Sequence, residues 1–492
     1  MALKLVYGDI ALGAAEDAAI TVTDAESFST PTSLPFGVDT GAISTLEHNG
    51  WGLSHDYKAK STQPFALWSD SISNAEGVFT TPPVITIEFD EQYTSTGLTF
   101  RFSPDAEEYC SEIGVAWYQN NVIKDAGTYY PNAGQYAVEN TVEAFNKIVI
   151  YLYKTHLPNR RAKLEYIGIG IIREIGGREL KNASFIHEIN LISDAIPINV
   201  LDGSFHSESD VDYIFQKKQP VSAYDGDRLI GTYYIESGER TGRRDYNISC
   251  QDAIGTLELD TFNGALWLED IPLAEAVDAV IGGAFVVVIS AELASKTIRG
   301  YIPKCKKREA LQHIAFAVGA CVDTAGTEKI KMFPQPTGTG TEIVKADTYI
   351  GGKVTTKDTV TAVNVTAYNR ITASAKEDID EVIKFDGVEY VFRPKVFTAE
   401  NPNVTSGTLP NVLEYSSCYL INSDNAQARA NAILAYHMRR DTYSSKHVLN
   451  GQTTGDRVNV HLPWNESQGA NIVKMKISIS GINASETDFL LD

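Results

Sequence analysis

Residues 224–260 read YDGDRLIGTYYIESGERTGRRDYNISCQDAIGTLELD, and this stretch decides the fold of the region around it. Asp225-Gly226 is a strong two-residue turn signal between two runs rich in β-branched and aromatic residues. A second turn at 239–242 also carries glycine, and the end of the stretch resembles the start of a helix. The pattern predicts a hairpin, a third strand and a helix, and none of its residues is arranged for chemistry.

The returning strand has a clear two-residue period. Side chains that alternate in this way lie on opposite faces of a sheet, so one face is expected to be buried and the other wet. The face predicted to be buried carries Tyr246, Ile248 and Cys250. The face predicted to be wet carries Asn247, Ser249 and Gln251.

Upstream, the chain is also rich in strands. PPVITIEFDEQ (82–92) and GLTFRFS (97–103) alternate apolar and polar residues, and KIVIYLYK (147–154) is a more continuous apolar run. Several short strands with turns between them, from about residue 40 to 175, predict a β-sandwich of jelly-roll type.

Downstream, three stretches have helical spacing, at 272–283, 307–320 and 423–440. Gly282 and Gly319 are expected to stop the first two helices, and a cap is expected near Ser423 for the third. The fold class predicted for the whole chain is therefore mainly β with short helices, in β and α/β modules. A sandwich is expected first, followed by β-barrel domains and a small helix-hairpin module. The predicted boundaries are an N-terminal segment at 1–40, the sandwich at 41–176, a barrel at 177–265, a small α/β module at 266–340 and a second barrel at 341–492 with its helix at 423–440.

Charge excludes one class of partner. The chain has 63 acidic and 42 basic residues and a net charge of −21, so it lacks the basic footprint that nucleic-acid binding requires. No apolar run approaches the ~20 residues that cross a bilayer, and the N-terminus does not resemble a secretory signal. The five cysteines are scattered, which predicts a protein made in a reducing cytoplasm with buried thiols.

Motifs for catalysis are missing from the sequence. Cys305, His313 and Cys321 share a neighbourhood, but helix-face or buried positions explain them better than a nucleophile and its base. The acidic run 377–381 lacks the central glycine of a calcium loop, and closely spaced Cys/His pairs for zinc are absent. We therefore expect no enzyme activity, no catalytic residue, no metal site and no cofactor.

Aromatic residues of the N-terminal part are candidates for ligand binding. Trp51, Trp68 and Trp117, together with Tyr118, fall near predicted loops or strand ends of the sandwich. Exposed aromatic rings in such places stack against the faces of sugars. The alternative is that these rings belong to the hydrophobic core, which is the more common location for tryptophan.

The order of elements after residue 180 resembles that of phage and prophage tail or baseplate hub proteins, a family also found in phage-tail-like particles. The first similar segment is the hairpin region 225–258, with Gly231 midway along a strand. The second is GYIPKCKKREALQHIAFAVGACVDTAGTEKIKMFP (300–334), a helix leading into strands with a glycine turn. The third is the long Ala-rich helix followed by GDRVNV (455–460) and ANIVKMKISISGI (470–482).

The resemblance implies a structural component of a tail, a baseplate or tail-tip hub that connects the tail tube to the tip. It implies β-barrels that join as a homo-trimer ring, contacts with other tail or baseplate proteins, and a location in the virion or particle after synthesis in the bacterial host cytoplasm. The resemblance fits both a contractile and a non-contractile tail. The sandwich lies outside the resemblance and is similar to discoidin-like, carbohydrate-binding domains. This leaves an alternative function, a receptor-binding tail protein whose sandwich recognises a cell-wall glycan.

Overall fold

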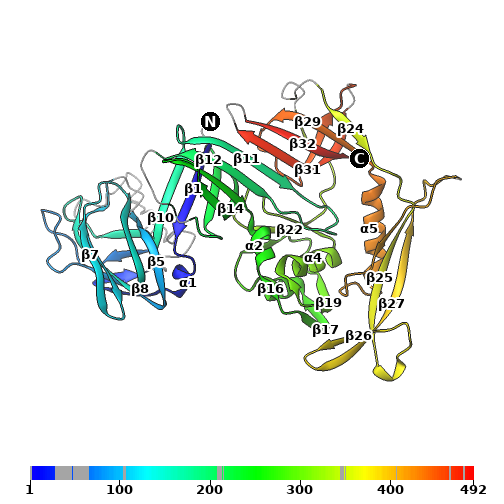
Figure 1. Ribbon diagram of the computed structural model, residues 1–492, viewed down its shortest axis with the longest axis horizontal. Helices are drawn as coiled ribbons and strands as arrows, with labels where there is room; N and C mark the ends of the chain where they lie inside the picture. The colour runs from blue at the N-terminus through cyan, green and yellow to red at the C-terminus, as the bar shows by residue number, and fades with distance from the viewer. Residues whose placement is uncertain are drawn as a thin grey trace, which may run out of the picture. The chain divides into compact units, whose positions relative to one another are not determined.

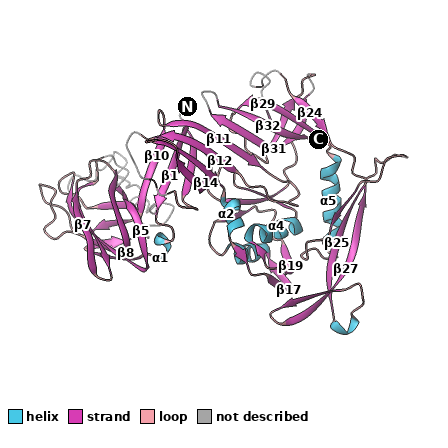
Figure 2. Ribbon diagram, in the orientation of Figure 1, coloured by secondary structure: helices cyan, strands magenta, loops and turns pink. Residues whose placement is uncertain are grey.

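The computed structural model describes residues 3–27, 47, 66–102, 107–207, 213, 215–343, 348, 351–405, 407–464, 467–479 and 483–492. The chain divides into two compact units. Unit 1 comprises Met1–Leu5, Ile175–Asp212 and Pro220–Asp492, and unit 2 comprises Val6–Glu174 and Tyr213–Gln219. Strands dominate both units and the helices are short, which confirms the predicted fold class (Figure 2). The finer domain boundaries remain predictions.

Unit 2 is built almost entirely of strands (Figure 1). Its elements are α1 (Ala14–Asp17), β2 (Ala19–Thr23), β3 (Ala25–Ser27), β4 (Leu67–Ser69), β5 (Val84–Phe102), β6 (Cys110–Gln119), β7 (Val122–Tyr129), β8 (Gln135–Thr155) and β9 (Lys163–Gly168), and it shares β1 (Leu3–Ile10) and β10 (Gly170–Gly176) with unit 1.

One hydrogen-bonded sheet, in the order β3-β4-β9-β5-β8-β6-β7 with β2 paired to β5, surrounds the core of unit 2. The first half of β5 lies between β2 and β8, and its second half lies between β8 and β9. Register shifts in the middle of the β5–β8 pair allow both long strands to change direction. The two sequence runs read as strands at 82–92 and 97–103 are therefore parts of one strand, whose inward side chains include Ile85, Ile87 and Phe100, each fully buried.

Unit 1 contains one large sheet, a small helical module and a second sheet with a helix. The large sheet includes β11 (Leu180–Glu188), β12 (Val200–His206), β13 (Pro220–Asp225), β14 (Arg228–Arg240), β15 (Asp245–Gln251), β23 (Thr341–Glu342), β24 (Lys353–Thr356), β29 (Asp441–Val448), β30 (Arg457–His461), β31 (Ser467–Ile479) and β32 (Asn483–Leu491).

The strand order of this sheet is β10-β1-β13-β14-β15-β12-β11-β31-β32-β29-β24, with β30 paired to β31 and β23 to β30. The predicted hairpin is present. Asp225 pairs with Arg228 around Gly226, which adopts φ 63°. On the returning strand β15, the side chains predicted to be buried are at most 3% exposed. Strands far apart in the chain meet at the centre of the sheet, because β31 pairs with β11, nearly 300 residues earlier.

The helical module follows β15 directly. It comprises α2 (Ala253–Leu259), β16 (Thr261–Phe262), β17 (Ala265–Pro272), α3 (Leu273–Ile281), β18 (Val287–Ile289), β19 (Thr297–Ile302), β20 (Cys305–Lys306), α4 (Lys307–Val318), β21 (Ala320–Asp323) and β22 (Ile330–Pro334). Helices α3 and α4 end at Gly282 and Gly319, both in the left-handed conformation that favours glycine. The glycine stops predicted from the sequence are thus confirmed.

The second sheet, in the order β26-β27-β25-β28, is covered on one face by helix α5 (Figure 1). Its elements are β25 (Ala362–Ile371), η2 (Ala373–Ala375), β26 (Glu381–Phe385), β27 (Val388–Glu400), β28 (Val412–Tyr415) and α5 (Ala426–Met438). Helix α5 begins three residues later than the cap expected near Ser423, because Asn422 and Asn425 exchange side-chain hydrogen bonds with the backbone of a preceding turn. Side chains of α2, α3, α4, α5 and β25 share one hydrophobic core.

Candidate interaction surfaces

One face of the large sheet in unit 1 is mainly polar from β14 to β24. Its outward side chains are mostly small and polar on β15, β12 and β11, and charged residues gather on β31, β32, β29 and β24. The cross-strand register places them in continuous rows. These rows are Glu239–Asn247–Ser204–Asn182, Ser237–Ser249–Asp202–Ser184–Ser478, Ile186–Lys476–Glu486–Lys446 and Glu188–Lys474–Asp488–Ser444–Lys353. We call this surface the polar face.

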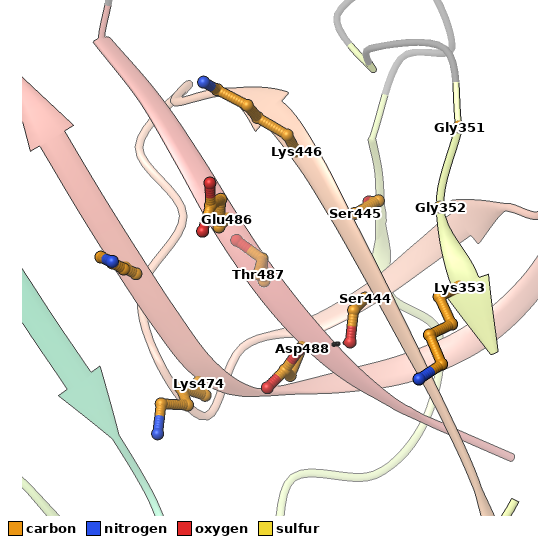
Figure 3. Close-up of a pocket in the computed structure, with 11 residues that line it drawn as sticks. Gly351, Gly352, Lys353, Ser444, Ser445, Lys446, Lys474, Glu486, Thr487 and Asp488 are labelled. Carbon is orange, nitrogen blue, oxygen red and sulfur yellow. Dashed lines mark hydrogen bonds between the residues drawn. The ribbon is translucent and has the colours of Figure 1, made fainter. Parts of the chain in front are cut away.

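A groove of about 610 Å³ lies at the end of the polar face over β24, β29, β32 and β31 (Figure 3). Four lysines line it, against the two carboxylates of Glu486 and Asp488. These lysines are Lys353, Lys446, Lys474 and Lys476. We call this region the lysine groove. An excess of positive charge in a chain of net charge −21 marks the groove as electrostatically distinct from the surface around it.

Cross-strand partners hold the groove in shape. Ser444 Oγ donates a hydrogen bond of 2.6 Å to Asp488 Oδ1, which Figure 3 marks by a dashed line. Lys474 Nζ contacts Glu188 Oε2 at 2.9 Å, and this hydrogen bond is the main reason why the pKa of Lys474 is raised. Lys446, Lys476 and Lys353 are exposed. Alternating charges on neighbouring strands stabilise the sheet.

The opposite end of the polar face carries three exposed carboxylates, with the exposed Arg240 next to Glu239 on β14. Asp202 on β12 and Glu236 and Glu239 on β14 are all exposed. Ser249 Oγ donates to Asp202 Oδ1 (2.8 Å) and Asn247 Nδ2 donates to Glu239 Oε1 (3.0 Å), so two of the carboxylates are oriented by β15. We call these three residues the carboxylate end.

Beneath the sheet lies a buried polar cluster that joins β15, the helical module and the C-terminal strands. Thr324 Oγ1 donates to Asp252 Oδ2 (2.6 Å) and accepts from Asn199 Nδ2 (3.0 Å). Thr454 Oγ1 donates to Asp323 Oδ2 (3.0 Å). Each of these residues is at most 5% exposed. A cluster so fully enclosed and mutually bonded serves to fix the elements that contribute to it.

Two buried groups in this interior have shifted pKa values. Burial raises the pKa of Asp252 to about 6, while hydrogen bonds from Thr324 and the backbone of Gly255 oppose the shift. Burial lowers the pKa of His187 to about 4, and its Nε2 is hydrogen-bonded to the hydroxyl of Tyr233. Both groups are protected from solvent, so their titration acts on stability.

The aromatic residues predicted to bind a ligand do not come together. Trp51 lies outside the described residues. Trp117 is fully buried in the core of unit 2, where its ring packs edge-on against Tyr129 at 6.5 Å, and a buried indole is not available to stack on a sugar. Trp68 is half-buried on β4, and Tyr118 is half-buried on the outer face of β6.

Trp68 borders a charged cluster instead of an open aromatic platform. The guanidinium of Arg161 lies over its ring at 5.6 Å. Next to it, Lys163 is buried and contacts Glu47 at 2.9 Å and Glu108 at 2.6 Å. A buried lysine with two carboxylate partners holds residue 47 against β9, and removal of one partner would leave an uncompensated charge.

Tyr118 lies on the outer face of β6 and pairs with Lys147, four residues along β8 from Tyr151. Tyr151 and Tyr153 are stacked at 5.9 Å with an angle of 4° between their planes. Tyr153 lies over Gly114, where a Cβ atom would meet its ring at 2.7 Å. The glycine thus allows a tyrosine ring to lie flat on the sheet. The sequence signal for this arrangement was the alternation of Tyr151 and Tyr153 in the run 147–154.

The thiols are poor candidates for nucleophilic chemistry. Burial raises the pKa of Cys321 to about 12 and that of Cys305 to about 11, so both thiols stay protonated near neutral pH. Cys418 Sγ donates to the backbone oxygen of His313 (3.5 Å). Within the described ranges, three or more His, Cys, Asp or Glu side chains do not gather in a way that could hold a metal. Among the helices that the structure describes, none has the length and apolar character to cross a membrane.

Neither the polar face nor the buried polar cluster was predicted from the sequence. Their residues come from strands hundreds of positions apart, so no local spacing indicates them. Two weak signals were present. Lys474 and Lys476 alternate in the run 470–482, and Asp252 precedes a helical stretch, as N-capping residues do.

No family model and no curated protein matches the chain. Solved structures with a similar fold include a tail protein from Neisseria meningitidis MC58, with 14% identity, a TM-score of 0.46, and coverage of 64% of this chain and 93% of that one. Another is the 43 kDa tail protein of prophage MuSo2 from Shewanella oneidensis, with 10% identity, a TM-score of 0.44, and coverage of 65% and 95%. A third is a type VI secretion system component from E. coli, described as similar to the T4 tail proteins gp27 and gp5, with 9% identity, a TM-score of 0.40, and coverage of 64% and 74%.

Proposed function

We propose that this protein is a structural component of a phage tail or phage-tail-like particle, in which it acts as a baseplate or tail-tip hub that joins the tail tube to the tip. In this role it performs no catalysis. It works by contacts with copies of itself, arranged as a trimeric ring, and with neighbouring tail proteins.

The observation that carries the proposal is the convergence of the three segments that resemble hub proteins. The first segment forms β14 and β15, and the third forms β30 and β31, and all four strands belong to one sheet. The second segment forms α4, which shares its hydrophobic core with α5 from the third. Segments matched separately along the sequence thus form one structural unit, as a common fold requires and as chance similarity does not.

The wide polar face also suits this role. Its residues are small or charged and its strands are fixed by continuous pairing, so it offers a preformed surface to other proteins without an apolar patch that would aggregate before assembly. A rigid surface loses little conformational entropy when it binds, which favours assembly from a large number of copies and partners.

The proposal is tested on particles purified from a strain that carries the coding sequence. Antibodies raised against the purified chain are expected to label one end of the tail in electron micrographs. Deletion of the coding sequence is expected to abolish complete tails, and expression from a plasmid to restore them. Absence of the chain from purified particles, or normal tails after deletion, would contradict the proposal.

A second candidate function is recognition of a cell-wall glycan by unit 2. The favouring observation is the stacked pair of half-buried tyrosines Tyr151 and Tyr153 on the outer face of β8. The half-buried Tyr118 lies on the same outer face, on β6. We expect Tyr118→Ala and Tyr151→Ala to reduce binding on a glycan array while circular dichroism remains unchanged. Binding that is absent in the parent protein, or unaffected in both variants, would rule this function out.

A further inference from the structure

The charged cluster of unit 2 brings four ionisable side chains together around Lys163. Lys163 Nζ lies 2.6 Å from Glu108 Oε2 and 2.9 Å from Glu47 Oε2, so the amine contacts two carboxylates at once. Arg160 Nε lies 3.5 Å from the other oxygen of Glu108, Oε1. The side chains of Lys163, Glu47 and Glu108 are 3%, 1% and 14% exposed, so water is largely excluded from the amine and from both carboxylates.

The charged cluster contains each group that the formation of an amide requires. The amine of Lys163 is a nucleophile, and the carboxyl group of Glu108 is the electrophile beside it. Glu47 Oε2 is within hydrogen-bond reach of the amine, as a general base must be. The backbone N of Arg161 donates to Glu47 Oε1 (2.7 Å) and so orients this carboxylate. The guanidinium of Arg160 lies beside Glu108 Oε1, where negative charge develops in the transition state.

We propose that Lys163 and Glu108 form an isopeptide cross-link within unit 2, with Glu47 as the general base. A proton passes from Lys163 Nζ to Glu108 Oε2, which leaves a neutral amine next to a neutral carboxyl group. The nitrogen attacks Glu108 Cδ, and Glu47 carries a second proton from this nitrogen to Oε2, which departs as water. The Nζ–Cδ bond forms and the Cδ–Oε2 bond breaks, so an ammonium and a carboxylate become an amide and one water.

Burial favours the cross-link over a simple ion pair. Two buried charges carry a desolvation cost, whereas an amide is uncharged. Groups that the fold holds in contact react at effective concentrations on the order of 10⁵ M or higher. A site that excludes water also protects the amide from hydrolysis. Lys147 and Glu88 of the same unit are also 2.9 Å apart, but their side chains are 25% and 58% exposed, so we expect them to remain an ion pair.

The cross-link joins the start of β9 to the segment that precedes β6. The five cysteines of the chain are free thiols, and an isopeptide bond persists in a reducing cytoplasm where a disulfide does not. The bond closes a loop of the chain and lowers the conformational entropy of the unfolded state, which stabilises unit 2. This effect is the same whatever the chain assembles with, so the inference does not depend on the proposed function.

The test is the intact mass of the purified full chain under denaturing and reducing conditions. We expect a mass that is lower than that of the sequence by one water molecule. Digestion with trypsin is expected to give a branched peptide that joins residues 102–124 to residues 162–173, because trypsin does not cleave after an acylated lysine. A succinimide at Asp225-Gly226 also loses water, but it produces no branched peptide.

Two variants of the charged cluster and one control make the result specific. Lys163→Arg keeps the positive charge without a nucleophilic amine, and Glu47→Gln keeps the shape of the side chain without the base. Both variants are expected to have the full mass of their sequences and the near-UV circular dichroism spectrum of the parent. Glu88→Gln changes the exposed ion pair instead and is expected to retain the loss of water.

The parent protein decides the question even where a variant fails to fold. A parent with the full mass of its sequence and no branched peptide would overturn the inference, and so would a loss of water that persists in either variant of the charged cluster. Labelling of particles tests the proposed function separately. A chain that is found at the tail tip without the cross-link would retain the function and lose this inference.

Discussion

Asp252 connects the large sheet to the helical module and titrates in a pH range that is easily measured. Its carboxylate caps helix α2 by accepting from the backbone N of Gly255 (3.0 Å), and it also accepts from Thr324 Oγ1 (2.6 Å). Burial raises its pKa from 3.8 to about 6. We predict that Asp252→Asn changes how the stability of unit 1 depends on pH.

The sign follows from linkage. A carboxyl whose pKa is raised on folding binds its proton more tightly in the native state than in the unfolded state. Its contribution to stability is fully present below pH 3.8 and is lost as the pH rises through about 6. A shift of about two pKa units corresponds to about 3 kcal/mol, at 1.4 kcal/mol per unit. Asparagine does not titrate and still caps a helix well, so the variant removes this loss and keeps the cap.

The assay is urea denaturation of the parent and variant at intervals from pH 4 to pH 7. The difference in unfolding free energy is expected to shift by about 3 kcal/mol in favour of Asp252→Asn as the pH rises. Taking the difference cancels the groups that the two proteins share. Asp278→Asn, the same substitution at an exposed carboxyl on α3, serves as the matched control. A difference that stays constant across this range, or shifts in the opposite direction, would refute the reasoning.

Three other predictions concern single side chains. The unfolding free energy of the parent is expected to fall by about 3 kcal/mol as the pH falls from 6.5 towards 4, because the buried imidazole of His187 has a pKa of about 4. His187→Gln is expected to remove this decrease. Urea denaturation over the same pH series would show a slope opposite to that caused by Asp252. Gly300→Ala is expected to lower the melting temperature of unit 1 markedly, because the added Cβ would lie 2.2 Å from the backbone O of Tyr419 and the residue has φ 130°. Gly283→Ala has open space around it, so it is expected to lower the unfolding free energy by only about 1–2 kcal/mol, measured by calorimetry. Trp117→Ala is expected to destabilise unit 2 by about 3–5 kcal/mol in chemical denaturation, as loss of a core ring does, and a variant of parental stability would contradict the buried position.

Features determined by neighbouring residues could be predicted from the sequence. The Asp225-Gly226 turn requires a positive φ that glycine supplies, and the glycines at 282 and 319 end helices for the same reason. The alternation in 245–251 predicted the buried and wet faces, because side chains of a strand point to opposite sides whatever the strand pairs with. Only Gln251 departs from this pattern, since it is 8% exposed beside helix α2.

Features determined by pairing between distant strands could not be predicted from the sequence. The run 82–103 contains a break in its alternation, which indicates a turn between two strands as readily as a bend within one. Both halves of the run pair with β8, so the break is a bend within the single strand β5. Trp117 shows a similar limit, because residue type alone does not separate a core tryptophan from an exposed one. The lysine groove collects Lys353, Lys446 and Lys476 from three strands, and each of them alone is an ordinary solvated lysine.

The buried cluster and the polar face depend on each other. Asp252 directly follows β15, which orients the carboxylate end, and His187 lies on β11 next to Glu188, the partner of Lys474 in the groove. An ionised Asp252 makes unit 1 less stable at neutral pH, and a buried hydrophobic residue in its place would avoid this loss. A polar cluster accepts only one arrangement of its donors and acceptors, however, and so fixes the register of every strand that contributes to it. Since a shift by one residue would exchange the polar face for the core face, this register keeps the polar side chains on the outside of the sheet.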